Sequence, residues 1–225
     1  MYQTFAKRLL DITFALVILV ATFPIALTIA AIIKCESKGP VLFTQNRTGL
    51  HGQQFRLRKF RSMTSSNDVL DHTVENQPTK IGTILRTLSL DEIPQLINII
   101  RGEMSFIGPR PWIPEYFEHM NKTQRQRTNV LPGLTGLAQV YGRNNLTINQ
   151  KIKYDLVYVK DISFKEDMKI VFLTIKTVFD KSTQEIAKSG IHNELAILRK
   201  QSILEAEDSN GNDARYYSSG GNINA

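Results

Sequence analysis

A long uncharged apolar segment near the N-terminus constrains the fold of this chain more than any other feature. Residues Ile12 to Ile33 carry no charge and lie between Asp11 and Lys34. As a helix this segment would be roughly 33 Å long at about 1.5 Å per residue, enough to cross the hydrocarbon core of a bilayer. It is too long for the apolar region of a signal peptide, and it has no small-x-small cleavage site. The sequence therefore predicts a membrane helix.

Two details indicate how this helix meets the membrane. Pro24 lies in its middle, where the missing N–H and the ring predict a kink, with the freed carbonyl near the hydroxyls of Thr22 or Thr28. Basic residues stand at both ends of the segment: Lys7, Arg8, Lys34, Lys38 and Arg47. Because positive charge favours the cytoplasmic side, both ends are drawn to one leaflet, which a straight helix cannot satisfy. The charges favour a re-entrant helix that bends at Pro24, and a spanning helix stays the alternative.

Composition limits the partners and the compartment. The 225 residues carry a formal net charge of +7, and a basic surface favours polyanions: nucleic acid, anionic lipid headgroups or phosphorylated small molecules. Cys35 is the only cysteine, so one chain can form neither a disulfide nor a cysteine metal site, which fits a reducing cytoplasmic environment. The four histidines are scattered without ligand spacing, which argues against a histidine metal site.

The residues after the apolar segment predict an α+β domain with a small sheet. Residues 41–45 and 53–58 read as two strands around a glycine-containing loop, which predicts a β-hairpin. Glycine and proline predict built turns at 108–111 and 132–136. Helical patterns cover 80–86, a segment from Asp91 with Ile93, Leu96, Ile97 and Ile100 on one face, 148–159, 165–179 and 194–206.

These elements predict three parts of the chain. A membrane helix occupies residues 1–38, a cytosolic domain residues 39–180, and a C-terminal extension residues 181–225, whose tail from Asp208 is predicted to be disordered. The core pattern fades in the extension. The helix at 165–179 is amphipathic, which suits packing on the core or lying along the membrane surface.

Asp91 and Glu92 are the leading candidates for chemistry. Ser89 and Glu92 fit a capping box, which would place both carboxylates at a helix N-terminus, where the dipole stabilises a carboxylate and favours bound phosphate. A structural role is the alternative. The chain has neither a P-loop nor a dinucleotide-binding glycine motif. A carboxylate that handles phosphate would then work with Mg²⁺ or attack phosphorus directly. Basic residues near strand ends and turns could clamp a diphosphate: Lys59, Arg61, Arg86 and Arg110.

A series of motifs in order along about residues 5 to 180 identifies a family. They are Lys7-Arg8-x-x-Asp11, the proline-broken helix, Pro40-Val41-Leu42-Phe43-x-Gln45-x-Arg47-x-Gly49, Phe55-x-x-x-Lys59-Phe60-Arg61-Ser62-Met63, Leu85-Arg86 to Gln95, Gly108-Pro109-Arg110-Pro111, Pro132-Gly133-Leu134-Thr135-Gly136 and Gly142-Arg143-Asn144. In these motifs the chain resembles the bacterial sugar transferase family, the monotopic polyprenyl-phosphate phosphoglycosyl transferases that initiate glycan assembly, in its minimal catalytic form. It departs from many members at Phe23, where they have a small polar residue before the proline.

The resemblance implies a two-step transfer. Asp91 would attack the β-phosphate of a UDP-sugar, expel UMP and hold the phosphosugar until polyprenyl (undecaprenyl) phosphate takes it. Glu92 would hold Mg²⁺. The implied substrate contacts are Lys59, Arg86 and Arg110 to phosphates, Arg143 to the nucleotide or sugar, and Asp155 at a further acidic site position.

The resemblance also implies a location and partners. The re-entrant helix would lie in the bacterial inner membrane, with the catalytic domain and its amphipathic helices on the cytoplasmic face. The partners would be the UDP-sugar donor, the polyprenyl-phosphate acceptor and the membrane, not nucleic acid, and the helix at 165–179 with the tail could support a homodimer. Two alternatives remain: a glycosyltransferase that releases UDP, and a non-catalytic basic membrane-bound adaptor.

Overall fold

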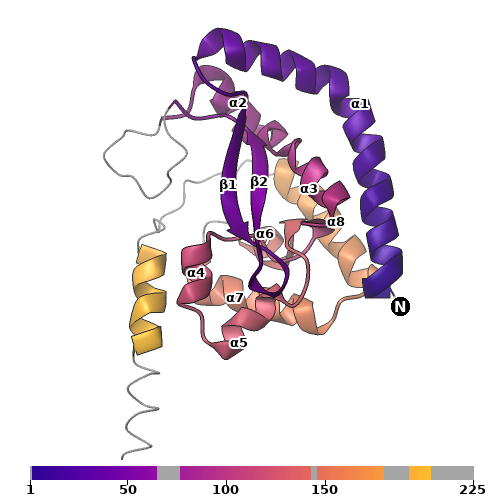
Figure 1. Ribbon diagram of the computed structural model, residues 1–225. Helices are drawn as coiled ribbons and strands as arrows, with labels where there is room; N and C mark the ends of the chain where they lie inside the picture. The colour runs from indigo at the N-terminus through magenta and orange to yellow at the C-terminus, as the bar shows by residue number, and fades with distance from the viewer. Residues whose placement is uncertain (1, 65–76, 143–145, 180–192, 204–225) are drawn as a thin grey trace, which may run out of the picture.

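The computed structural model describes residues 2–64, 77–142, 146–179 and 193–203, and it has the predicted α+β character (Figure 1). A long helix, α1 (Lys7–Glu36), follows the short η1 (Tyr2–Ala6). Antiparallel β1 (Leu42–Thr48) and β2 (Gln54–Phe60) form one small sheet, and parallel β3 (Ser105–Ile107) and β4 (Gly133–Thr135) form another. The other helical elements are η2 (Leu50–Gly52), α2 (Lys80–Thr87), η3 (Leu90–Glu92), α3 (Gln95–Arg101), α4 (Pro114–Glu118), α5 (Lys122–Arg125), η4 (Gln126–Thr128), α6 (Leu137–Tyr141), α7 (Ile148–Lys160), α8 (Phe164–Phe179) and a last helix at 193–203.

Within the described part of the chain, α1 is the one helix long and apolar enough to cross a membrane, judged by length and composition. Many of its apolar side chains are exposed, and Figure 1 shows that its ribbon changes direction along its length. Thr22 and Thr28 donate to the carbonyls of Ile18 and Pro24. Neither therefore donates to the carbonyl of Val20, which lies four residues before Pro24 and loses its N–H partner. The prediction that these hydroxyls satisfy the freed carbonyl is wrong.

The first turns of α1 are fastened to the domain by polar contacts. Lys7 Nζ lies 2.6 Å from Asp167 Oδ2 on α8. Arg8 donates to the carbonyl of Ile100 at 3.0 Å, at the end of α3. Asp11, which is buried, accepts a hydrogen bond from the backbone N–H of Phe106 at 3.1 Å. These contacts give the Lys-Arg-x-x-Asp motif a physical role, which is to dock the start of α1 on α3, β3 and α8.

The predicted hairpin is confirmed, with strands slightly longer than the sequence pattern indicates. Gln45 pairs with Leu57 and Phe43 with Lys59. The turn uses left-handed backbone at His51 (φ 53°) and Gly52 (φ 80°), as a tight connection requires. Of the apolar side chains of β2, Leu57 is buried against α1 and α3, and Phe60 is buried against α1 and α2.

The helix predicted from Asp91 begins later, but most of its predicted face packs on the core: Leu96 is buried, and Ile93 and Ile100 pack against the same cluster. Ser89 has a positive φ of 56° and makes no cap bond, so the predicted capping box is wrong. Asp91 and Glu92 lie on the 3₁₀ turn η3, and α3 begins after Pro94. Ile99 is fully buried, whereas Ile97, which was predicted to face the core, is half-buried.

The second sheet was not predicted. Residues 132–136 were expected to form only a turn, but Gly133–Thr135 pairs with Ser105–Ile107. A side chain on Gly133 would collide with the backbone of Gly108, so the close approach of the two segments depends on glycine. The sequence shows no strand pattern for β3 and β4, because each strand has only three residues and pairs with a partner far along the chain.

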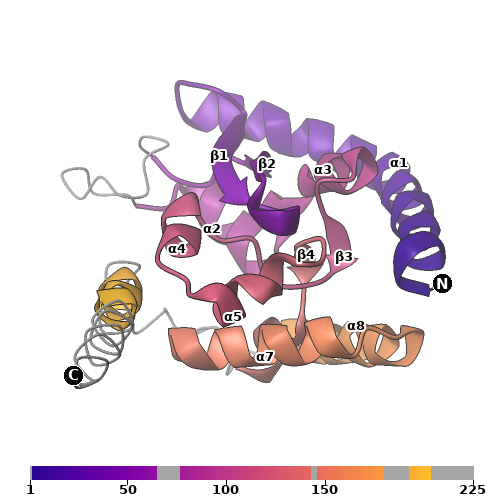
Figure 2. The ribbon, with the colours of Figure 1, turned by 60° about the horizontal axis from the view of Figure 1, so that its bottom comes forward.

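The C-terminal helices agree with the predicted ranges, and α7 and α8 run along one side of the molecule, opposite α1 (Figure 2). Ile170 on α8 is fully buried, while Phe172 is 73% exposed, so this helix packs on the core and also presents an apolar face. The core does not end at α8: Leu198, in the helix at 193–203, is fully buried against Ile113 and Tyr116. The tail predicted to be disordered from Asp208 lies outside the described residues.

Candidate active site

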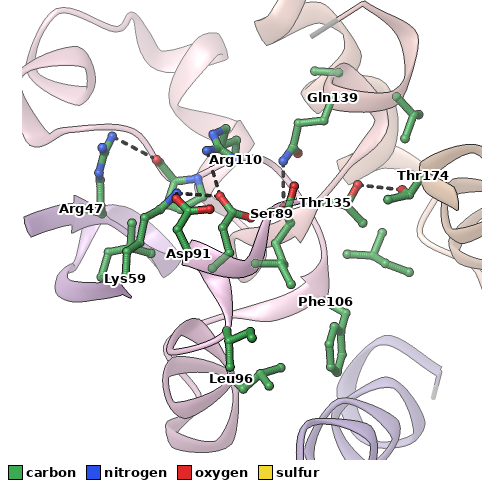
Figure 3. Close-up of a pocket in the computed structure, with 18 of the residues that line it drawn as sticks. Arg47, Lys59, Ser89, Asp91, Leu96, Phe106, Arg110, Thr135, Gln139 and Thr174 are labelled. Carbon is green, nitrogen blue, oxygen red and sulfur yellow. Dashed lines mark hydrogen bonds and ion pairs between the residues drawn. The ribbon is translucent and has the colours of Figure 1, made fainter. Parts of the chain in front are cut away.

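A large cleft with a volume of about 1660 Å³ runs between α1, β2, η3 and α8. Its lining is both charged and apolar, and Lys7, Asp11 and Asp167 are also part of it. One part carries charged side chains from β2, η3 and the segment around Arg110, and another carries apolar side chains of α1 and α8. In Figure 3 the charged residues converge, whereas Leu96 and Phe106 line a separate apolar wall.

Four predicted site residues form one cluster in this cleft. Lys59 Nζ on β2 lies 2.6 Å from Glu92 Oε1 and 3.8 Å from Asp91 Oδ2. Arg110 Nη2 lies 3.3 Å from the same Glu92 oxygen. The side chain of Asp91 is 11% exposed, so it is nearly buried but still reaches the cleft. Two carboxylates and two cations from three segments therefore meet at one place (Figure 3).

The two carboxylates have opposite electrostatic environments. Burial raises the pKa of Asp91 above its ordinary value; Lys59 opposes this and Glu92 adds to it. Burial also acts to raise the pKa of Glu92, but the charges and hydrogen bonds of Lys59 and Arg110 outweigh it and lower that pKa to about 2. Glu92 is therefore the fixed anion of the cluster. Asp91 keeps a desolvated, weakly paired carboxylate, which is the state expected of a nucleophile.

The two other arginines considered as phosphate contacts are placed differently. Arg86 lines the cleft and is exposed; its Nη1 lies 3.0 Å from Met63 Sδ, and its charge helps to lower the pKa of Asp91. Arg61 also lines the cleft, but its guanidinium donates to the carbonyls of Ser37 and Lys38, where the chain leaves α1. Among the described residues, Arg86 thus lies at the cleft without an ion pair to either carboxylate, and Arg61 fastens the C-terminal end of α1.

Asp155 does not join the Asp91 cluster. It is 2% exposed on α7, and its Oδ2 accepts two hydrogen bonds from Arg127, from Nη2 at 2.7 Å and from Nε at 2.9 Å. Burial raises the pKa of Asp155, and Arg127 opposes this. The structure therefore places Asp155 in a buried ion pair that also lines the cleft, and its predicted substrate contact stays a prediction. Arg143 lies outside the described residues, and its predicted contact stays a prediction.

Three side chains near the cluster were not among the predicted site residues. Arg47 on β1 lines the cleft, is half-buried, and has its pKa lowered to about 10 by the burial of its guanidinium and by Arg110. Its Nη2 donates to Gln45 Oε1 at 2.6 Å, while its Nε has no hydrogen-bond partner within the described residues. The second side chain is Arg127, which donates to the carbonyl of Arg110. The third is Gln139, which lines the cleft and whose Oε1 has no hydrogen-bond partner in the described part of the chain. The Gln45-x-Arg47 motif was a usable signal for Arg47; no local pattern marks Arg127.

The metal ligands that this cleft can offer are carboxylates, which suit a magnesium ion. The described residues hold no group of three or more histidine, cysteine, aspartate or glutamate side chains that could enclose a metal. Mg²⁺ does not need one, because it binds one or two carboxylates together with substrate phosphates. The adjacent Asp91 and Glu92 offer hard oxygen ligands of that kind at the charged part of the cleft.

Comparisons with known proteins point in one direction. The model of the family described as "Bacterial sugar transferase" matches residues 2–181. "Uncharacterized sugar transferase EpsL" of Bacillus subtilis is 41% identical over 174 residues, which cover 76% of this chain and 86% of that protein. "Exopolysaccharide production protein ExoY" of Rhizobium meliloti is 38% identical over 192 residues, 77% of this chain and 85% of the relative.

A further relative is longer than this chain. "UDP-glucose:undecaprenyl-phosphate glucose-1-phosphate transferase" of Klebsiella pneumoniae is 41% identical over 181 residues, which cover 75% of this chain but 39% of that protein. The chain thus spans most of the Bacillus and Rhizobium relatives and about two fifths of the Klebsiella one. In all three, the aligned length exceeds 170 residues, so the similarity extends well beyond the residues of the cleft.

Proposed function

Because the chain belongs to the bacterial sugar transferase family, we propose that it transfers a sugar 1-phosphate from a UDP-sugar to polyprenyl (undecaprenyl) phosphate and releases UMP. The observation that carries this proposal is the cleft, in which a nearly buried aspartate stands among cations while the adjoining wall is apolar. A diphosphate and a lipid phosphate need such a site, charged where phosphates meet and apolar where the lipid chain lies. The names of relatives, including the Klebsiella glucose-1-phosphate transferase, support the same reaction class.

The first step uses the ionised carboxylate of Asp91. One carboxylate oxygen attacks the β-phosphorus of the donor, a new O–P bond forms, and the bond from that phosphorus to the bridging oxygen breaks. UMP leaves with the bond electrons, and the phosphosugar stays on Asp91. Lys59 and Arg110, which already lie beside the carboxylates, would offset the charge on the diphosphate, and exposed Arg86 would reach its outer oxygens.

The second step regenerates the enzyme. An oxygen of polyprenyl phosphate attacks the same phosphorus, the bond to Asp91 breaks, and the product is a polyprenyl diphosphate sugar. The lipid chain would lie along the apolar wall that Phe14 on α1 and Met168 on α8 help to line. Burial of apolar surface there would hold the acceptor while its phosphate lies at the charged cluster.

Glu92, with Asp91 beside it, would hold Mg²⁺ in this proposal. When bound, the ion neutralises phosphate charge and stabilises the departing UMP. The pKa of Glu92 is lowered to about 2, so this carboxylate is ionised at neutral pH. Lys59 and Arg110 both contact Oε1 of Glu92, so the second oxygen of that carboxylate is the one to offer to a metal.

We place the protein at the bacterial inner membrane with the catalytic domain on the cytoplasmic face. The docking of the start of α1 on α8 supports the membrane location, because apolar residues of both helices line the same cleft. A bend at Pro24 that returns the helix to one leaflet would keep α2 and the hairpin on the same side as the N-terminus. The apolar face of α8, including Phe172, would lie at the interface, and self-association through that face is a further proposal.

The test is an assay of nucleotide release with protein in nanodiscs, Mg²⁺, undecaprenyl phosphate and a panel of UDP-sugars that starts with UDP-glucose. We expect UMP from one donor, loss of release on chelation, and loss in Asp91→Asn but not in Asp161→Asn, which removes an exposed carboxylate after α7. With donor alone, we expect about one UMP per protein and a mass increase of one phosphosugar on the peptide with Asp91. Release of UDP would replace the proposal with a glycosyltransferase, and a fully active Asp91→Asn would refute the covalent step.

A further inference from the structure

The segment that carries Arg110 is held by its backbone at both ends. At the first end, the N–H of Gly133 on β4 donates to the carbonyl of Pro109 at 2.9 Å. At the other end, the N–H of Thr48 on β1 donates to the carbonyl of Trp112 at 2.8 Å. The two donors belong to different sheets, so residues 109–112 link the β1–β2 sheet to the β3–β4 sheet.

The two carbonyls between these ends are held by arginine side chains. Arg127 Nη2 donates to the carbonyl of Arg110 at 2.8 Å, and Arg47 Nη1 lies 3.5 Å from the carbonyl of Pro111. All four consecutive carbonyls from 109 to 112 therefore have donors, which come from three elements: β4, η4 and β1. A segment bound at every carbonyl, with two prolines of fixed φ, has little backbone freedom.

Arg127 is the member of this set whose geometry is most tightly determined. It is 3% exposed, its Nε and Nη2 both donate to Asp155, and its guanidinium carbon lies 3.8 Å from the centre of the Trp112 ring. The ion pair and the ring fix the plane of the guanidinium, and that plane points Nη2 at the Arg110 carbonyl. A lysine has no planar fork and could not make these contacts together.

We propose that Arg127 is a positioning residue for the transfer reaction, acting with Asp155 to hold Arg110 beside Glu92. The sequence of contacts is continuous: Asp155 orients Arg127, Arg127 binds the backbone of Arg110, and the Arg110 side chain lies 3.3 Å from Glu92. Arg110 is thereby preorganised for the donor diphosphate, and Asp155 acts on Arg110 through Arg127. The inference rests on the proposed function, because it assumes that Arg110 meets the donor.

One measurement tests the positioning without any substrate. Amide hydrogen exchange reports the bonds that hold the 109–112 segment, through the N–H groups of Gly133 and Thr48. In Arg127→Lys we expect exchange at both amides to be faster by about 10-fold or more, because the segment between them loses a bond that restrains it. Exchange unchanged at both amides would overturn the proposal, whatever reaction the protein catalyses.

The second measurement separates positioning from general damage by a double-mutant cycle on kcat/KM for the donor. Arg127→Lys alone should lower kcat/KM on the order of 100-fold, as small misplacements of binding groups do. In an Arg110→Ala background the same change should cost less than about 3-fold, because there is no longer an Arg110 side chain to misplace. An equal loss in both backgrounds would mean that Arg127 does not act through Arg110, and would overturn the proposal.

A control variant and a milder variant separate loss of positioning from loss of stability. Ile152→Ala removes buried packing from α7, one turn before Asp155, without touching the ion pair. It should lower the melting temperature and leave kcat/KM unchanged; a loss equal to that of Arg127→Lys would point to destabilisation and overturn the proposal. If Arg127→Lys does not fold, Asp155→Asn keeps the shape and an acceptor oxygen, and it should show smaller changes in the same direction. Absence of UMP release from the native chain would remove the proposed function, and the exchange measurement would still decide the positioning.

Discussion

Replacing Lys59 with methionine should move the acid limb of the pH–rate profile to higher pH. Asp91 attacks only when it is ionised, so activity falls as the pH drops through its pKa. Burial raises that pKa, and Lys59 is the main group that lowers it again. Without the ammonium the ionised form of Asp91 becomes less favourable. The variant should therefore lose more activity at pH 6 than at pH 8.5.

The size of the effect follows from the 3.8 Å between Lys59 Nζ and Asp91 Oδ2. Two unit charges at about 4 Å interact by about 4 kcal/mol at an effective dielectric constant of about 20. Arg86 and Arg110 remain in the variant, and water would enter the space, so we take about a third of this, or roughly 1.4 kcal/mol. Because about 1.4 kcal/mol corresponds to one pH unit, the acid limb should move by on the order of one unit.

The assay is UMP release at saturating acceptor from pH 5 to 9, with Lys153→Met as the control for loss of one positive charge. Lys153 is exposed on α7, so its removal should leave the limb in place. Methionine keeps the length and apolar stem of lysine, so packing along β2 should be retained. An acid limb that stays in place or moves to lower pH in Lys59→Met would refute the reasoning that this lysine holds Asp91 in its ionised form.

Three further predictions concern the fold and the metal. Asp167→Ala leaves Lys7 without its buried partner and should lower the free energy of unfolding by about 3 to 5 kcal/mol, measured by denaturant titration in detergent; a change below 1 kcal/mol would contradict the docking role of this contact. Leu198→Ala should cost about 2 to 5 kcal/mol, whereas exposed Ile197→Ala on the same helix should cost less than about 1, and equal effects would mean that the helix at 193–203 does not pack on the core in solution. Glu92→Gln should raise the Mg²⁺ concentration for half-maximal activity by about 10-fold or more, and an unchanged requirement would remove Glu92 from the metal site.

Elements with a strong local pattern could be read from the sequence. The apolar run that forms α1, the alternation around the glycine loop of the hairpin, and the helical periodicities of α7 and α8 each depend on residues close in the chain. Asp91 could be singled out as well, because the motif from Arg86 to Gln95 is local. The sequence predicted Lys59 and Arg110 only as part of a clamp around a diphosphate. The structure adds that both side chains lie beside the Asp91–Glu92 pair.

Contacts between distant segments were decided by tertiary structure alone. Asp155 was predicted as a site carboxylate from the family resemblance, and its partner could not be read from the sequence. That partner, Arg127, lies 28 residues away in a polar stretch without periodicity. The pairing of β3 with β4 and the burial of Leu198 were missed for the same reason. Local sequence determines which backbone conformations are favourable, whereas the partner of a buried charge or a short strand depends on which surfaces meet when the chain packs, and that is set by the whole fold.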